Sequence, residues 1–274
     1  MIPYLFFAVL LSFALYHGYQ VGYRHWNRKR LHRTPFPEAW SKILTDSIPI
    51  YTKLSESEKK QLHTATQIFI SEKSFVGLEG LDVTDEMRVI IAAQACLLLL
   101  NRPTTYYPWL RQIFIRPGAY THQDHHVDEH GVKSSKKVTR LGESWTRGRV
   151  VLSWEHSQKG GANFTDGHNV VIHEFAHQLD QEDGNADGAP ILNARGSYQT
   201  WARLLRPEFD KLQKQQGKKR RRPVLRDYGA TNAAEFFAVA SEAFFEKPRQ
   251  LKKKHPDVYE ALADYYQVKP EDWD

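Results

Sequence analysis

The chain has 274 residues, 41% of them hydrophobic, and a formal net charge of +6. This is enough for one large domain with a sizeable core, with or without an appendage. The only cysteine, Cys96, excludes a disulfide within the chain. Residues 1–33 carry five Arg or Lys and no acid, so the remainder has a net charge of only +1. The basic run 218–222 precedes Pro223 and is interpreted as a solvated loop, so we expect no nucleic-acid partner.

The amino-terminal segment predicts a membrane anchor. Residues 2–16 are uncharged and almost wholly apolar, and the first cations follow Tyr23, in residues 24–33. We therefore expect an anchor at 1–23, a basic juxtamembrane linker at 24–36 and a domain at 37–274. By the positive-inside rule, this is a single-pass protein of the inner (cytoplasmic) membrane with its domain in the cytoplasm. A secretory segment and a membrane-surface helix are the alternatives.

The rest of the chain predicts an α+β fold. A helical region is expected from about residue 37 to 101, followed by strands at 111–116 and 149–154 and a helical carboxyl-terminal part. Cys96 lies in an apolar helix at 87–100, where a buried, reduced thiol is the expected state. We expect a mixed sheet beside the helix that contains residues 173–177.

Histidines are frequent between the two predicted strands and shortly after them. Four lie between His122 and His130, which could bind a metal, although a polar surface loop near a substrate cleft is the preferred interpretation. His156 and His168 are possible cleft residues.

The segment His173-Glu-Phe-Ala-His177 is the strongest sign of chemistry. It belongs to a helix predicted to begin near Asp166 and to end at Gly184. His173 and His177 are then one turn apart on one face, where both imidazoles can reach a single zinc ion. Glu174 projects to the side and can accept a proton from water activated by the metal. An ordinary buried amphipathic helix is the alternative.

A third ligand is available in the apolar segment 227–246. Thr231 or Asn232 can cap a helix that contains Glu235 in its first turn, among phenylalanines and with no Lys or Arg within four residues. An ionised carboxylate in such surroundings needs a partner, and zinc is one. The alternative is a carboxylate that stabilises its own helix N-terminus through the dipole.

Two further acids have a spacing that places them near the ligands. Asp180 follows His173 by seven residues, and Glu242 follows Glu235 by seven residues. Each can orient a ligand by a hydrogen bond, or can equally be a surface or capping group.

The motif HEFAHQLD, followed by Tyr228-Gly-Ala-Thr-Asn-Ala-Ala-Glu235-Phe-Phe-Ala, resembles the Mlc titration factor A family of bacterial zinc peptidases. It also resembles the catalytic domain of anthrax lethal factor, and the likeness covers roughly residues 40–265, including a strand beside the active site within residues 142–154. The resemblance implies a zincin-like domain of the gluzincin type. Its ligands for Zn²⁺ would be His173, His177 and Glu235, with Glu174 as general base and the Tyr228 hydroxyl stabilising the transition state. Without the resemblance, a buried Tyr228 bonded to backbone would be preferred.

The expected function is that of a membrane-tethered zinc metallopeptidase that hydrolyses cytoplasmic peptides or proteins, with an aminopeptidase-like preference implied by the resemblance. The alternative is a partner-binding protein that sequesters a cytoplasmic transcriptional regulator. A pure binding protein would not need Glu174 beside an intact ligand set.

Overall fold

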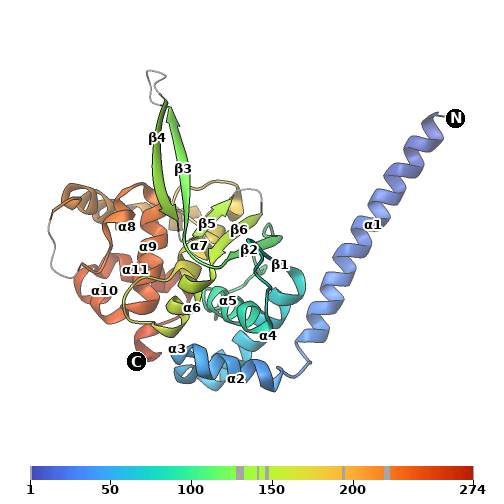
Figure 1. The fold of residues 1–274 in the computed structure, drawn as a ribbon, viewed down its shortest axis with the longest axis horizontal. Coiled ribbons are helices and arrows are strands. Elements are labelled where there is room, and N and C mark those ends of the chain that lie inside the picture. The colour runs from blue at the N-terminus through green and yellow to red at the C-terminus, as the bar shows by residue number, and fades with distance from the viewer. Residues whose placement is uncertain are drawn as a thin grey trace. The chain divides into compact units, whose positions relative to one another are not determined.

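The computed structural model describes residues 2–127, 133–140, 142–145, 148–192, 195–218 and 223–273. The chain divides into two compact units, Met1–Pro37 and Glu38–Asp274. The second unit contains the sheet and the helices of the candidate site (Figure 1).

The first unit consists mainly of one helix, α1 (Ile2–Leu31). Among the described residues, no helix is both long and apolar enough to cross a membrane. The anchor predicted at 1–23 is therefore not supported. The strongly apolar run is about 15 residues long, whereas a span needs about 20, and His17 and Gln20 lie in the part of α1 that would have to complete it.

The second unit begins with helices whose ends are specified locally. They are α2 (Glu38–Ser47), α3 (Pro49–Lys53), α4 (Glu56–Glu72) and α5 (Asp85–Leu97). Ser55 and Glu58 form a capping box at the start of α4, and the Thr84 side chain caps α5. The helical region expected at 37–101 is confirmed, except that the short strand β1 (Ser74–Gly77) interrupts it.

A mixed four-stranded sheet follows, which confirms the predicted α+β class. Its order is β1, β2 (Gln112–Arg116), β6 (Arg149–Ser153) and β5 (Gly142–Trp145). The first three strands are parallel, with Phe114 opposite Val151, and β5 is antiparallel to β6. β5 is therefore an edge strand of this sheet, while the buried β2 and β6 carry the apolar residues expected of a parallel pair.

A separate hairpin leaves the body of the domain between β2 and β5. It pairs β3 (Tyr120–Val127) with β4 (Lys133–Arg140) and projects outward (Figure 1). The loop predicted at His122–His130 is thus wrong for residues 122–127, which are in a strand because each pairs with a residue of β4. Residues 128–130 of that prediction lie outside the described residues, as do residues 219–222 of the predicted basic loop.

The carboxyl-terminal part is helical, as expected. Its α-helices are α6 (Trp154–Ala162), α7 (Val170–Asp180), α8 (Arg195–Gln215), α9 (Ala233–Glu246), α10 (Pro248–Lys254) and α11 (Pro256–Tyr266). Three short 3₁₀ helices accompany them: η1 (Gln181–Asp183), η2 (Asp227–Ala230) and η3 (Pro270–Trp273). Pro248 and Pro256 begin the two closing helices, because proline fits a first helical turn.

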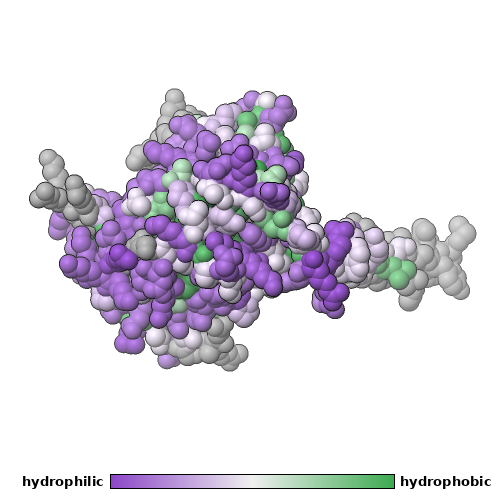
Figure 2. All heavy atoms as spheres, turned by 90° about the horizontal axis from the view of Figure 1, so that it is seen from below, coloured by the Kyte–Doolittle hydropathy of each residue, from purple (hydrophilic) through white to green (hydrophobic). Residues whose placement is uncertain are grey.

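Phe175 of α7 is at the centre of the core. Its ring centroid lies 4.9 Å from that of Tyr107 and 5.5 Å from that of Phe69 in α4. The Tyr107 hydroxyl donates to the carbonyl oxygen of Ala95 in α5 at 2.7 Å. These contacts join α4, α5 and α7, whereas the face of the molecule shown in Figure 2 is mainly hydrophilic with scattered apolar residues.

Replacing Phe175 with Ala should lower the free energy of unfolding by about 3 to 5 kcal/mol, because the fully buried ring leaves a cavity that its neighbours cannot fill. Urea unfolding followed by circular dichroism measures the change. Lys214→Ala on the exposed face of α8 is the control and should stay within about 0.5 kcal/mol of the wild type. A loss below about 1 kcal/mol for Phe175→Ala would mean that this ring is not central to the core.

Candidate metal centre

The helix that carries the two histidines begins at Val170, three to four residues later than predicted from the sequence. Asn169 is its N-cap, and the side chain of Asn169 accepts a hydrogen bond from the backbone N–H of Ile172 at 3.0 Å. Asp166 instead closes a turn by accepting from the His168 N–H at 2.9 Å. Gly167 has a φ of +70° there, which is incompatible with an α-helix. The helix therefore starts only after this turn.

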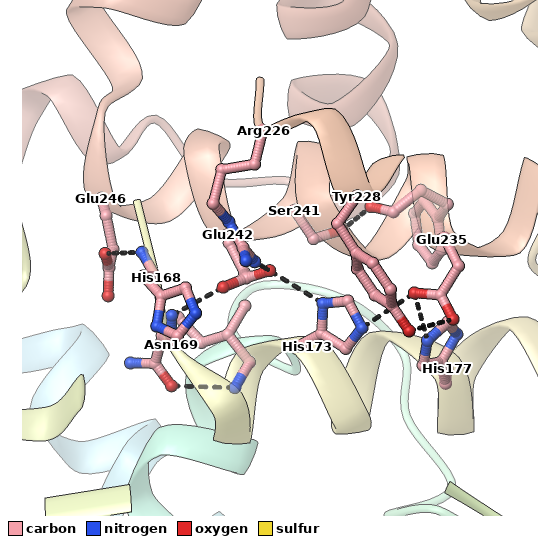
Figure 3. A network of polar contacts seen from close by, with 12 residues as sticks. His168, Asn169, His173, His177, Arg226, Tyr228, Glu235, Ser241, Glu242 and Glu246 are labelled. Atoms are coloured by element: carbon pink, nitrogen blue, oxygen red, sulfur yellow. Dashed lines mark hydrogen bonds and ion pairs between the residues drawn. The ribbon is translucent and has the colours of Figure 1, made fainter. Parts of the chain in front are cut away.

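His173 and His177 share one face of α7, as the spacing predicted. Their ring centroids are 4.8 Å apart, and the two residues are only 8% and 9% exposed. Both Nε2 atoms are directed toward the same carboxylate of a second helix (Figure 3). The two histidines therefore face the interior of the protein and are not part of a solvated helix face.

Glu235 of α9 supplies the carboxylate. Its Oε2 lies 3.0 Å from Nε2 of His173 and 3.3 Å from Nε2 of His177. One ligand atom from each of these three residues lies within 4.8 Å of the other two. The structure therefore brings together the three side chains that the sequence indicated. They come from two helices, and His173 and Glu235 are 62 residues apart in the chain.

The helix N-terminus does not need the Glu235 carboxylate. Asn232 caps α9, and its side chain accepts from the Glu235 backbone N–H at 2.9 Å. The carboxylate of Glu235 turns instead toward the histidines and toward Tyr228, whose hydroxyl donates to Oε1 at 3.2 Å. The side-chain cap of α9 is therefore Asn232, and the Glu235 carboxylate is bonded to His173, His177 and Tyr228 instead.

Glu242 orients the first histidine. Its Oε1 accepts from Nδ1 of His173 at 2.8 Å, so that Nε2 of the same ring faces Glu235. Glu242 is 1% exposed, and its charge is compensated by Arg226, which donates to Oε1, and by the Asn169 N–H, which donates to Oε2 at 2.6 Å (Figure 3). The orienting interaction predicted as one possibility for Glu242 is present.

Sequence reasoning missed Arg226 and Asn169. Asn169 could have been found, because an Asn directly before an apolar helical run is a typical N-cap. Arg226 had no such signal: it lies 16 residues from Glu242, in a segment without periodicity. Only the fold shows that the two are paired.

The second acid at the same spacing has a different role. Asp180 is buried at the end of α7, but its Oδ2 accepts from the Gly188 N–H at 3.0 Å. It therefore ties the loop after α7 to the helix, and an additional role in orienting a ligand stays a prediction. Burial raises the pKa of Asp180 to about 6 against the opposing effect of this hydrogen bond.

Glu174 lies on the side of α7 that faces the sheet. It is buried, and a side-chain carbon added to Gly142 of β5 would lie only 2.7 Å from the Glu174 carboxylate oxygen Oε1. Glycine at residue 142 thus allows the edge strand to pass directly over this carboxylate. Tyr228 is 52% exposed, which excludes the buried tyrosine considered as an alternative.

His156 and His168 lie outside the cluster of candidate ligands. His156 Nδ1 lies 2.9 Å from the Ser153 hydroxyl at the start of α6. His168 is exposed, and its backbone N–H also donates to Oε2 of Glu246 at 3.0 Å. Partial desolvation of the ring, reinforced by the charge of Arg226, lowers the pKa of the His168 imidazole. Neither ring is part of the group of three candidate ligands.

The protonation of the cluster follows from its carboxylates. Burial by itself would lower the pKa of His173, but hydrogen bonds to Glu235 and Glu242 outweigh it and raise this pKa to about 10. Burial would raise the pKa of Glu235, but its hydrogen bonds to both histidines hold that pKa well below its usual range. In the same way the pKa of Glu242 is lowered, mainly by His173, against its burial. In the metal-free cluster the carboxylates of Glu235 and Glu242 are therefore ionised, and His173 is protonated between them.

These residues fit a zinc ion. Two imidazole nitrogens and one carboxylate oxygen are a donor set that zinc prefers, and three protein ligands are typical of a catalytic zinc site. The hydrogen bond from His173 Nδ1 to a carboxylate is the usual way in which a metal-binding histidine is oriented. The carboxylate oxygen Oε2 of Glu235, which lies close to both imidazoles, is also a suitable ligand for a cation.

Comparison with known proteins agrees with this geometry. The family model of the glucose-regulated metallo-peptidase M90 matches residues 23–267. The chain belongs to the M90 metallo-peptidase family. The M90 chain is 39% identical over 257 residues to the uncharacterized protein slr2042 of Synechocystis sp., covering 92% of this chain and 93% of that protein. It is 30% identical over 241 residues to Mlc titration factor A of Escherichia coli, covering 87% and 88%. The resemblance inferred from the two motifs is thereby confirmed, and membership of this M90 family implies a metal.

Binding of zinc to the metal-free M90 protein should release about one proton per site at pH 7.5. His173, with a pKa of about 10, carries a proton at that pH and must lose it to become a ligand. The apparent affinity should accordingly rise about tenfold per pH unit between pH 7 and 9. Isothermal titration calorimetry in two buffers of different ionisation enthalpy measures the released proton.

Two variants complete this measurement. Glu242→Gln removes one of the carboxylates that raise the pKa of His173, so it should release a smaller fraction of a proton and bind zinc about 10 to 100 times more weakly. Glu208→Gln removes a carboxylate that pairs with His255 elsewhere and is the control. Zinc binding without proton release in the wild type would show that His173 is neutral before the metal binds.

Proposed function

We propose that the chain is a zinc-dependent peptidase of the gluzincin type that hydrolyses peptide bonds in peptides or proteins. The observation that carries this proposal is the convergence of His173, His177 and Glu235 from two helices, with the Glu174 carboxylate on the same helix as both histidines. Family membership supports the metallopeptidase class. A preference for short peptides and for their amino ends is proposed from the family resemblance.

His173, His177 and Glu235 would hold the metal. A zinc ion bound there supplies a Lewis acid that activates water and polarises the carbonyl to be cleaved. The hydrogen bond from His173 to Glu242 keeps the ring in place, so that Nε2 is available as a ligand. The shell of buried apolar residues around α7 limits the access of bulk water to these ligands.

Glu174 is placed to move the proton. It follows the first ligand directly, is buried, and lies against Gly142 at the start of the edge strand β5. Its carboxylate would accept a proton from the attacking water and return it to the leaving amine. Among the described residues no strand pairs with the outer edge of β5, where an extended peptide could add beside Glu174.

Tyr228 is placed to stabilise the developing negative charge. Its hydroxyl reaches Oε1 of Glu235, and its ring centroid lies 5.8 Å from that of His173. A half-exposed phenol at this position can move from the carboxylate to an oxyanion when substrate binds. Its hydrogen bond to Glu235 is thus a resting arrangement that substrate replaces.

A regulatory protein partner is the second proposal. The name of the Escherichia coli relative, Mlc titration factor A, connects that protein with Mlc. A cytoplasmic regulator is the corresponding partner proposed for this chain. The buried thiol of Cys96, which forms no disulfide, supports the proposal of a reducing, cytoplasmic location.

Glu174→Gln should leave zinc content at about one ion per chain and reduce turnover about 10²- to 10⁴-fold, because an amide has the shape of the carboxylate but cannot accept the proton. Hydrolysis of a set of short peptides, with metal analysis of the same samples, tests this. Glu86→Gln, on the exposed side of α5, is the control. Unchanged turnover in Glu174→Gln, or hydrolysis by folded wild-type protein freed of metal, would contradict the proposal.

Glu235→Ala should weaken zinc binding by more than about 100-fold, a larger loss than removal of an orienting residue causes. The melting temperature of the wild type should rise with added zinc, whereas that of the variant should not respond. Differential scanning calorimetry with and without zinc measures both, and circular dichroism reports whether the variant is folded. A folded Glu235→Ala protein that retains its zinc would place the third ligand elsewhere.

A further inference from the structure

Exposed large apolar side chains are concentrated in the first unit of the chain. Among the described residues, eight large hydrophobic side chains are exposed, and five of them belong to α1: Leu15, Tyr19, Val21, Tyr23 and Trp26. Each of these five residues is between 48% and 66% exposed. Single apolar residues on a surface are ordinary, but a contiguous group of them indicates an interaction site.

Four of these side chains form a stripe along one side of α1. With about 100° of rotation per helical residue, the spacing of Leu15, Tyr19, Tyr23 and Trp26 places them within an arc of about 80°. The ring centroids of Tyr19 and Tyr23 are 6.2 Å apart in a stacked arrangement, and those of Tyr23 and Trp26 are 5.9 Å apart. These four residues are called the apolar stripe below.

The apolar stripe leads into a basic segment. The guanidinium carbon of Arg30 lies 5.2 Å from the centre of the Trp26 ring, about one turn further along the same side of α1. All five Arg or Lys of residues 1–37 lie between Arg24 and Arg33, and these 37 residues contain no Asp or Glu. The surface of α1 therefore presents exposed rings next to positive charge, with no acid in the same unit.

The surface of an anionic membrane has the matching chemistry. Tyr and Trp side chains collect where lipid headgroups meet hydrocarbon, because their rings are apolar while their hydroxyl or N–H groups are polar. Arg and Lys next to such rings are attracted to negatively charged headgroups. Residues 2–16, which adjoin the stripe in the sequence, are uncharged and almost wholly apolar, as expected of a segment in contact with lipid.

Two other partners match this surface less completely. A second copy of α1 would bring together two segments that each carry five cations and no acid, and these would repel each other. A single-stranded nucleic acid could pair with the cations and stack on the rings. It has no apolar surface, however, to match residues 2–16.

We propose that the apolar stripe and residues 24–33 bind the surface of a membrane that contains anionic lipids. The rings of Tyr19, Tyr23 and Trp26 lie where the headgroups meet the hydrocarbon, and Lys29 and Arg30 contact lipid phosphates. The contact requires no helix that crosses the bilayer. No candidate metal ligand belongs to α1, so membrane binding is measurable independently of the metal centre.

Sedimentation of the full-length protein with lipid vesicles tests this proposal. One set of vesicles contains equal parts of phosphatidylcholine and phosphatidylglycerol, and the other contains phosphatidylcholine alone. The partition coefficient should be at least about tenfold higher for the anionic vesicles, because several cations contact their surface. Raising the ionic strength from about 0.1 M to about 1 M should weaken this binding, since salt screens exposed charges.

Two double variants separate the contribution of the rings from that of the charges. Tyr23→Ala with Trp26→Ala keeps every cation, and alanine favours the helix, so any loss of binding reports on the rings. This variant should lower the partition coefficient for anionic vesicles about tenfold or more. Lys29→Gln with Arg33→Gln keeps every ring and should also lower it about tenfold or more.

The matched controls change the same types of residue outside α1. Trp109→Ala removes an exposed tryptophan of the second unit. Lys253→Gln with Lys254→Gln removes two exposed lysines of α10. Both controls should bind vesicles as the wild type does, and circular dichroism verifies that every variant is folded.

Four results would overturn the proposal. The first is the absence of binding to either kind of vesicle. The second is unchanged binding of the Tyr23→Ala, Trp26→Ala variant, which would reduce the effect to a general attraction of a basic protein. The third is binding of a single-stranded oligonucleotide without binding of vesicles. The fourth is a dimer that this same variant abolishes, again without vesicle binding, which would assign the stripe to a contact between two copies of the chain.

Discussion

The buried carboxylate of Glu242 is the group on which the arrangement of α7 and α9 depends. A charge that is 1% exposed is costly unless donors surround it, and here His173, the Asn169 backbone and Arg226 surround it. Those donors come from α7, from its N-cap and from the residue before η2, so satisfying one carboxylate fixes three segments. The register of the two helices that results places Glu235 opposite both histidines.

One turn further along α9, Glu246 is a second buried carboxyl group, and its pKa is shifted in the opposite direction to that of Glu242. Glu246 is four residues after Glu242, and burial together with the Glu242 charge raises its pKa to about 8. Glu246 accepts from the His168 N–H at 3.0 Å and contributes to the contact between α9 and the turn before α7. Of Glu242 and Glu246, therefore, the one that is paired with His173 and Arg226 has the lowered pKa.

The loop after α7 holds α7, α8 and the first turn of α9 together at Gly188. Asp180 holds the Gly188 N–H, and Trp201 holds the Gly188 carbonyl oxygen. Gly188 has a φ of +78°, and a side-chain carbon there would approach the Ala233 carbonyl oxygen to 2.4 Å. The loop thus packs directly on the first turn of α9, the turn that carries Glu235.

The amino-acid sequence by itself determined the local features. The spacing of His173 and His177, the apolar helix with Glu235 in its first turn and the two buried strands all follow from periods of 3.6 and 2 residues. It could not place the hairpin strand β3, whose polar residues show no alternation, because pairing with β4 decides that strand.

Only the tertiary structure distinguished two acids of equal spacing. Asp180 and Glu242 each lie seven residues after a candidate ligand, yet Glu242 bonds to His173 while Asp180 bonds to the Gly188 backbone. Periodicity gives the face of a helix, but not the neighbour that covers it. The partners here, Arg226 and the loop at Gly188, come from irregular segments whose positions depend on contacts that are distant in the chain.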